Sequence, residues 1–205
     1  MSMEIRSVSF FGCACGTQGD PHVDGAYAAA QAIARSGRRV VNGGGPGVMF
    51  AATSGAKAAG GKTTAVYYRP QHASNFEGAF PENRTDEAFE EANYILRTKK
   101  LLELSDASIV FNGGTGTISE FGMAWGVARL YFGHHKPVIL YGGFWRHLIA
   151  DFREHMLIRP EECSIITIVE TPEEAIAALD DYERVLRKNR HEHTACTDPE
   201  CFLIL

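Results

Sequence analysis

Short apolar runs alternate with helix-like segments along most of this chain, and this alternation limits the possible folds more than any other feature. The runs that we read as strands are residues 7–11, 39–41, 63–68, 108–111, 137–141 and 165–169. They are apolar almost throughout, which is typical of parallel strands that are buried on both faces. We therefore predict an α/β fold: a single-domain, doubly wound (Rossmann-like) sheet of mostly parallel strands with helices on both faces.

The segments between these runs carry helix signals. The clearest is Thr171-Pro172-Glu173-Glu174, in which a capping Thr precedes Pro at the first helical position and Glu at the third. Residues 69–85 contain Pro, Gly and Asn and interrupt the alternation, so we expect a functional or mobile connection there. The expected helices are residues 20–36, 48–59, 86–104, a segment ending near 132, residues 145–157, and a last helix from 171.

A chain of 205 residues is long enough for one domain with a core that needs no disulfide or metal to stabilise it. We assign residues 1–187 to a nucleotide-binding domain and 188–205 to a flexible tail. The tail holds residue types that bind metals, but their spacing is irregular, so we expect a solvated segment and no metal site. These residues are His191, His193, Cys196 and Cys201.

Composition excludes several classes of partner. The formal net charge of −5 argues against a nucleic-acid-binding protein, which would carry a basic stripe. No apolar run approaches the roughly 20 residues of a membrane helix.

The cysteine count of five is odd and the spacing of the cysteines is irregular, so we expect the protein to lie in a reducing cytoplasm. Cys13-Ala14-Cys15 is too closely spaced for the usual zinc pair, and we interpret it as loop packing.

The stretch from Asn112 to Glu120 carries the strongest functional signal. It follows an apolar run and precedes a helix, so its glycines, Gly113, Gly114 and Gly116, aim backbone N–H groups and a helix N-terminus at one point. Such a point attracts a phosphate. Two hydroxyls, from Thr115 and Thr117, and the carboxylate of Glu120 lie within reach of the same ligand.

Two further glycine-rich loops also follow strands. The loop at residues 42–47 supplies Gly44, Gly45 and Gly47, which leave room for a base or ribose, and the loop after the first strand supplies Gly12 and Cys13. Loops that follow parallel strands lie at the same edge of the sheet, where such folds bind ligands. We therefore group these residues with the central loop in one site.

Neither main loop fits a common nucleotide motif. Residues 113–116 do not match G-x-G-x-x-G, and no Lys-Ser/Thr follows the glycines as in a P-loop. Residues 43–47 match neither pattern. A nicotinamide cofactor and ATP hydrolysis are therefore not favoured.

The paired loops and an upstream Arg97 resemble the Lonely Guy (LOG) family, whose older label is lysine decarboxylase. Its hallmark is P-G-G-x-G-T-x-x-E with an Arg-Lys pair upstream. The residues that match the hallmark are Gly113, Gly114, Gly116, Thr117 and Glu120. The likeness extends over about residues 5–180.

The resemblance implies hydrolysis of the N-glycosidic bond of a nucleoside 5′-monophosphate, such as AMP, by a homodimer without metal or organic cofactor. Small residues at 51, 52 and 56 on the second helix suit close helix packing and favour the same homodimer. Such cleavage passes through a ribosyl cation that a carboxylate stabilises, so Glu120 is the catalytic candidate. Arg97 is expected to contact the phosphate or the departing base.

The sequence leaves other functions open. Asn112 stands where the hallmark has Pro, Thr98 where it has Lys, and Ser119 where many members have a first Glu. These departures favour a protein that binds a nucleotide or nucleotide-like cofactor without turnover. DNA binding through the shared fold is weakened by the acidic balance, and nothing in the sequence supports a pyridoxal-dependent decarboxylase.

Overall fold

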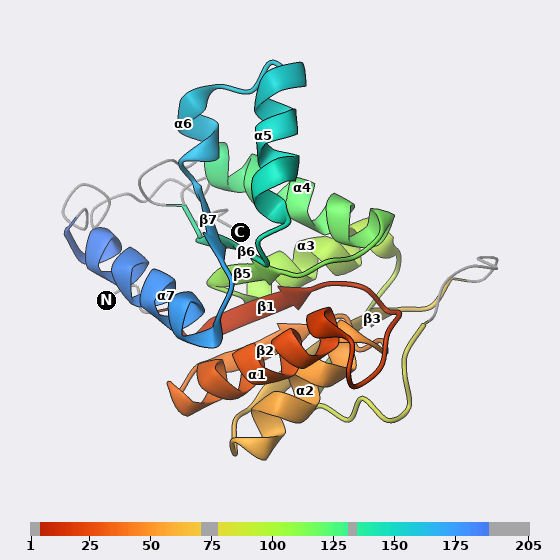
Figure 1. Ribbon diagram of the computed structural model, residues 1–205. Helices are drawn as coiled ribbons and strands as arrows, with labels where there is room; N and C mark the ends of the chain where they lie inside the picture. The colour runs from red at the N-terminus through yellow and green to blue at the C-terminus, as the bar shows by residue number, and fades with distance from the viewer. Residues whose placement is uncertain (1–4, 71–77, 131–134, 189–205) are drawn as a thin grey trace, which may run out of the picture.

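The computed structural model describes residues 5–70, 78–130 and 135–188. Within these ranges it contains one parallel sheet of seven strands in the order β4-β3-β2-β1-β5-β6-β7 (Figure 1). The strands are β1 Ser7–Phe11, β2 Arg39–Asn42, β3 Thr63–Tyr68, β4 Glu87–Glu91, β5 Ala107–Val110, β6 Val138–Tyr141 and β7 Ile166–Val169. The predicted fold class is confirmed.

Helices cover both faces of the sheet (Figure 1). One face packs against α1, α2 and α7 through a core that includes Phe10, Ile33 and Leu179. The other face packs against α3, α4 and α5 through a core that includes Leu101, Phe121 and Trp145. The helices are α1 Pro21–Arg35, α2 Val48–Ala58, α3 Tyr94–Leu104, α4 Thr115–Leu130, α5 Trp145–His155, α6 Pro160–Cys163 and α7 Pro172–Lys188.

The chain reverses its direction of winding beside β1. From β1 it runs outward through β2 and β3 to β4, then returns to place β5 on the other side of β1 and continues to β7. β1 and β5 are paired in parallel, with Phe10 opposite Ile109. The connections that follow these two strands diverge to opposite faces, and this divergence opens a crevice at their carboxyl ends.

The predicted helix at residues 86–104 is wrong in its first eight residues. Glu87–Glu91 forms the edge strand β4, paired with β3, and α3 begins only at Tyr94. The side chain of Asn93 accepts a hydrogen bond of 2.9 Å from the Leu96 N–H and so caps the helix. The apolar spacing that suggested one long helix includes Ile95, which is 61% exposed. Backbone pairing with β3 overrides that spacing.

The small residues of α2 have a role inside the chain. Ala51, Ala52 and Ala56 are buried in the core shared with α1. A Cβ on Gly55 would collide with the backbone of Tyr27 on α1, so the two helices pack at close range. These alanines therefore do not form an exposed surface for a partner subunit, and that basis for the predicted homodimer is lost. The homodimer itself stays a prediction.

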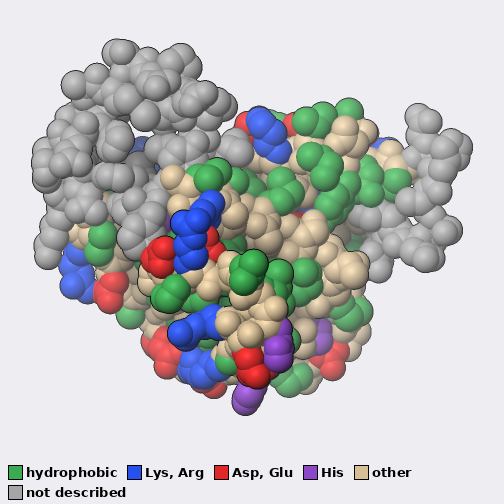
Figure 2. All heavy atoms as spheres, turned by 90° about the horizontal axis from the view of Figure 1, so that it is seen from above, with side chains coloured by type: hydrophobic (Ala, Val, Ile, Leu, Met, Phe, Trp, Pro, Cys, Tyr) green, Lys and Arg blue, Asp and Glu red, His purple; other side chains and the backbone are tan. Residues whose placement is uncertain are grey.

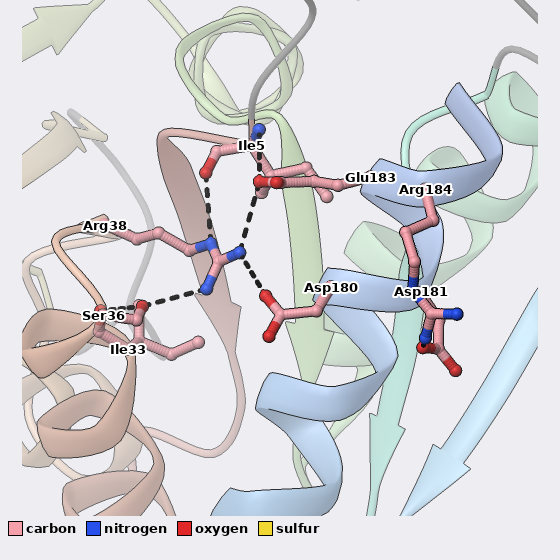
Figure 3. Close-up of polar contacts among 8 residues, drawn as sticks. All are labelled: Ile5, Ile33, Ser36, Arg38, Asp180, Asp181, Glu183 and Arg184. Atoms are coloured by element: carbon pink, nitrogen blue, oxygen red, sulfur yellow. Dashed lines mark hydrogen bonds and ion pairs between the residues drawn. The ribbon is translucent and has the colours of Figure 1, made fainter. Parts of the chain in front are cut away.

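At the amino edge of the sheet, Arg38 joins α7 to the strands (Figure 3). Its side chain is only 9% exposed. The guanidinium donates to the carbonyl of Ile5 at 3.1 Å, to Asp180 at 2.7 Å and to Glu183 at 3.2 Å. The Ser36 hydroxyl accepts a further bond of 3.0 Å. One buried side chain thus connects the start of β1, the start of β2 and α7.

We expect Arg38→Met to lower the free energy of unfolding by about 2–3 kcal/mol, because it removes the charged donor from the buried Ile5 carbonyl and the largely buried Glu183 carboxylate. Arg184→Met is the matched control, since the Arg184–Asp181 pair on α7 is exposed (Figure 3) and its loss should cost less than about 1 kcal/mol. Urea unfolding measures both. Equal losses in the two variants would contradict the role given to Arg38.

Two observations on the described residues concern surface charge and helix hydrophobicity. On the face above α5 and α6, Figure 2 shows basic and acidic side chains interspersed, so the described part of that face carries no continuous basic stripe. None of the helices within the described ranges is long and apolar enough to cross a bilayer.

Candidate functional site

Three glycine-rich loops meet at the carboxyl edge, as the sequence predicts. The Cys13 N–H, in the loop after β1, donates to the carbonyl of Asn112, in the loop after β5, at 3.0 Å. The carbonyl of Cys13 in turn accepts from the Val48 N–H, which begins α2, at 2.9 Å. The loop after β1 is therefore held between the other two by its own backbone.

Glycine is required where these loops touch. A Cβ on Gly113 would collide with Thr117 and would lie 2.8 Å from the Cys13 nitrogen. Gly47 has φ +60, and its Cβ would face the carbonyl oxygens of Cys13 and Cys15. Both positions therefore need glycine for close backbone approach, and Gly47 also needs it for its left-handed conformation.

A pocket of about 450 Å³ opens between these loops and the N-terminus of α4. Helix geometry leaves the first N–H groups of α4, from Thr115 to Thr117, without carbonyl partners inside the helix. A Cβ on Gly114 would meet no protein atom within 4 Å, so this residue borders open space. Unpaired N–H groups and a positive helix end beside an open glycine form an arrangement that holds phosphates.

Arg97 and Glu120 form a buried ion pair at one side of this pocket. Both side chains are only 8% exposed, and the Arg97 guanidinium donates to the Glu120 carboxylate. Arg97 Nε also donates to the carbonyl of Val66 on β3 at 3.2 Å. A Cβ on Gly43 would collide with the guanidinium, so the second glycine loop leaves space for it.

Burial raises the pKa of the Glu120 carboxyl above its ordinary value, and the adjacent Arg97 guanidinium opposes this shift without cancelling it. The pair has no net charge while both groups are ionised. Because the Arg97 guanidinium donates to this carboxylate, the carboxylate has a partner before any ligand enters.

An aromatic side chain lies beside the ion pair. Tyr94 lies with its ring centroid 6.0 Å from the Arg97 guanidinium carbon, a cation–π distance. Its hydroxyl donates to the Gly116 carbonyl at 3.1 Å and is 2.9 Å from the Ser119 hydroxyl. Tyr68 packs edge-on against Tyr94, with ring centroids 5.9 Å apart. The pocket thus has a polar phosphate end and an aromatic wall.

Most of the predicted site residues line this pocket. They are Gly12, Cys13, Arg97, Gly114, Thr115, Gly116, Thr117 and Glu120. Gly113 lies behind them, packed on Thr117. The structure does not place Gly44, Gly45 or Gly47 in the lining, because Tyr67, Met49 and the Cys13 loop cover them. These three glycines shape the site from behind.

Sequence reasoning missed five lining residues: Ala14, Met49, Tyr68, Tyr94 and Ser119. It also missed how the connection before β4 supports the second glycine loop. Asn83 is buried and its side-chain amide donates to the Gly45 carbonyl at 2.8 Å, while the Phe80 N–H donates to the Gly44 carbonyl at 3.0 Å. The one signal that the sequence offered was an Asn, Asn83, within a long connection.

The interpretation of Cys13-Ala14-Cys15 as simple loop packing needs correction. Cys13 and Cys15 form a disulfide in the structure. Cys163 is a free thiol. The predicted tail residues, including His191 and Cys201, lie outside the described residues.

A protein-family model described as "possible lysine decarboxylase" matches residues 49–179, which is more than half of the chain. The chain belongs to this family. The resemblance to the LOG family, which carries the older lysine decarboxylase label, is confirmed. The match contains α3, the central loop and α4, and therefore both Arg97 and Glu120.

Several individual proteins are similar to this chain in sequence or structure. A protein from Archaeoglobus fulgidus is 32% identical over 117 residues, which are 57% of this chain and 73% of that protein. A molybdenum cofactor binding protein from Rippkaea orientalis has a similar structure, with TM-score 0.64 and 25% identity, over 88% of this chain and 98% of its own. The Moco carrier protein from Chlamydomonas reinhardtii shares the fold with TM-score 0.63 and 21% identity, over 90% and 99% of the two chains.

Proposed function

We propose that this protein binds a nucleotide or nucleotide-like cofactor in the pocket between the glycine loops, and holds it without cleaving it. The observation that carries the proposal is that the carboxylate in the pocket is already paired with an arginine. Among the described residues that line the pocket, Glu120 is the one carboxylate, and its oxygen already accepts from Arg97.

The phosphate end of the ligand would lie at the N-terminus of α4. Gly114 leaves space there, and the hydroxyl of Thr115 adds a donor to the N–H groups of the first helical turn. The ring system would lie toward Tyr68 and Tyr94, since aromatic side chains provide stacking surfaces for planar heterocycles. A pocket of about 450 Å³ is within the range of small-ligand sites.

The departures from the LOG hallmark point the same way. Ser119 lines the pocket where many LOG members have a second carboxylate, and its hydroxyl is paired with Tyr94. Glycosidases commonly use two carboxyl groups, one for the leaving group and one for water or the sugar. The Rippkaea orientalis protein, which is described as a cofactor binding protein, supports a binding role for this chain as well.

Hydrolysis of a nucleoside 5′-monophosphate is the second candidate. The juxtaposition of Arg97 and Glu120 in the phosphate pocket favours it, because the pair matches the hallmark's Arg and Glu. Glu120 would stabilise a ribosyl cation and Arg97 the departing base or the phosphate. Such a reaction would need no metal or organic cofactor.

Incubation with AMP, GMP, IMP, CMP and UMP distinguishes the two candidates. For a binding protein we expect at least one nucleotide to raise the midpoint of thermal unfolding, while chromatography recovers every nucleotide intact. Release of a free base by the wild type but not by Glu120→Ala would establish hydrolysis and overturn the proposal. A protein that none of the five nucleotides stabilises would also overturn it in this form.

A further inference from the structure

The Cys13–Cys15 disulfide borders the ligand pocket. Cys13 lines the pocket and is partly exposed, and Cys15 is exposed. Small thiols in solution can therefore reach the bond from the side of Cys15. Neither sulfur has a role in the function proposed above.

The backbone of this cysteine loop is coupled to both glycine loops. The amide N–H and the carbonyl of Cys13 bond to Asn112 and Val48 respectively. Gly47 lies directly against the carbonyls of Cys13 and Cys15, and Gly113 lies against the Cys13 nitrogen. A change in the conformation of the cysteine loop therefore reaches the phosphate loop and the start of α2 without an intermediate element.

The local hydrogen bonding also favours one direction of reaction. The Cys15 N–H points at the Cys13 sulfur, with N and Sγ 3.0 Å apart. A hydrogen bond to sulfur stabilises the thiolate, and a stabilised thiolate is a better leaving group in disulfide exchange. Attack at the exposed Cys15 sulfur, with Cys13 leaving, is therefore the favoured route.

We propose that Cys13 and Cys15 form a thiol–disulfide exchange site whose redox state sets the affinity of the adjacent pocket. The co-reactant is a dithiol. One thiolate of the dithiol attacks Cys15 Sγ; the S–S bond breaks and its electron pair passes to Cys13 Sγ, which takes up a proton. The second thiol then attacks the mixed disulfide and releases Cys15. The dithiol loses two electrons and becomes a disulfide, and the two cysteines become thiols.

Reduction weakens ligand binding in this scheme. The disulfide restrains the loop in the conformation that packs on both glycine loops, and without it the ligand must order the loop on binding. Ordering loop side chains on binding opposes association, so the dissociation constant of the reduced protein should be about three- to tenfold higher. This affinity effect rests on the proposed binding function, whereas the exchange reaction itself does not.

The test uses the full chain with Cys163→Ser, Cys196→Ser and Cys201→Ser, which leaves Cys13 and Cys15 as its cysteines. Oxidised or reduced dithiothreitol sets the redox state, and iodoacetamide labelling with mass spectrometry counts free thiols. We expect no label after oxidation and two labels after reduction. AMP affinity, measured by calorimetry, should fall on reduction. Labelling of both cysteines after oxidation, or equal affinity in the two states, would overturn the proposal.

Two controls keep the outcome interpretable. Cys15→Ser should show the weaker affinity in both buffers, because it cannot form the bond. Amide hydrogen exchange gives a readout that needs no ligand: reduction should speed exchange at Val48, whose N–H bonds to the Cys13 carbonyl. If AMP binds in neither state, the proposed function fails, but labelling and exchange still decide the thiol chemistry. Unchanged exchange at Val48 would show that the loops are not coupled to the bond.

Discussion

Gly114→Ala should abolish binding of nucleoside 5′-monophosphates and leave the midpoint of thermal unfolding unchanged. A Cβ at this position meets no protein atom within 4 Å, and the backbone does not have positive φ, so the fold accommodates alanine. The added methyl group would fill the space that we assign to the phosphate. Loss of two charge-assisted hydrogen bonds at about 1.5 kcal/mol each lowers affinity by roughly a hundredfold or more. Calorimetric titration with AMP measures the loss.

The matched control is Gly122→Ala. Gly122 lies inside α4, about two turns beyond Gly114. It is exposed and also has no atom within 4 Å of its Cβ position, but it does not line the pocket. Alanine there should stabilise the helix by up to about 1 kcal/mol and leave AMP affinity unchanged. Equal AMP affinity for Gly114→Ala and wild type would place the phosphate elsewhere.

Glu120→Gln should lower the stability of the free protein and strengthen its binding of AMP. Glutamine leaves the buried Arg97 without a counter-charge, a loss that costs about 3–5 kcal/mol. The same change removes a negative charge from the pocket, which should tighten AMP binding about thirtyfold, because at an effective dielectric of about 20 a charge some 8 Å away contributes roughly 2 kcal/mol. Any base release that the wild type catalyses should stop.

Glu87→Gln is the control for this variant. Glu87 pairs with Arg39 at 2.5 Å on the edge strand, but its side chain is 50% exposed, so its loss should cost less than about 1 kcal/mol and leave AMP affinity unchanged. Urea unfolding and calorimetry measure both variants. If Glu120→Gln bound AMP more weakly than wild type, Glu120 would be a ligand contact and not a competitor for Arg97.

The central strands of the fold can be predicted from the sequence, because strands that are buried on both faces consist mainly of apolar residues. β1, β5 and β6 are largely buried, and each appears as a mainly apolar run that only serines interrupt, in β1 and β5. The edge strand cannot be recognised in this way. Glu87–Glu91 is largely exposed and acidic, so it lacks the apolar run, and its strand state comes from hydrogen bonds with β3.

The sequence likewise predicts one part of the candidate site and not the other. The glycines and threonines of the central loop could be predicted, because a strand, a glycine-rich turn and a helix in that order bring backbone N–H groups to one point. The aromatic wall is different, since Tyr68 and Tyr94 come from the end of β3 and the start of α3 and meet only once the sheet order is known. Arg97 was predicted from the hallmark, while its burial against Glu120 follows from the buried side of α3.

The measurement that tests the central claim most directly is a calorimetric titration of AMP and of adenosine into the wild-type protein, followed by chromatography of the AMP recovered from the cell. If the glycine loop holds the phosphate and the protein does not cleave its ligand, AMP binds with a saturable heat and is recovered intact. Adenosine lacks the phosphate and so loses the two hydrogen bonds counted above, and its affinity should be at least roughly a hundredfold lower. Equal binding of adenosine, or adenine in the recovered sample, would contradict the account.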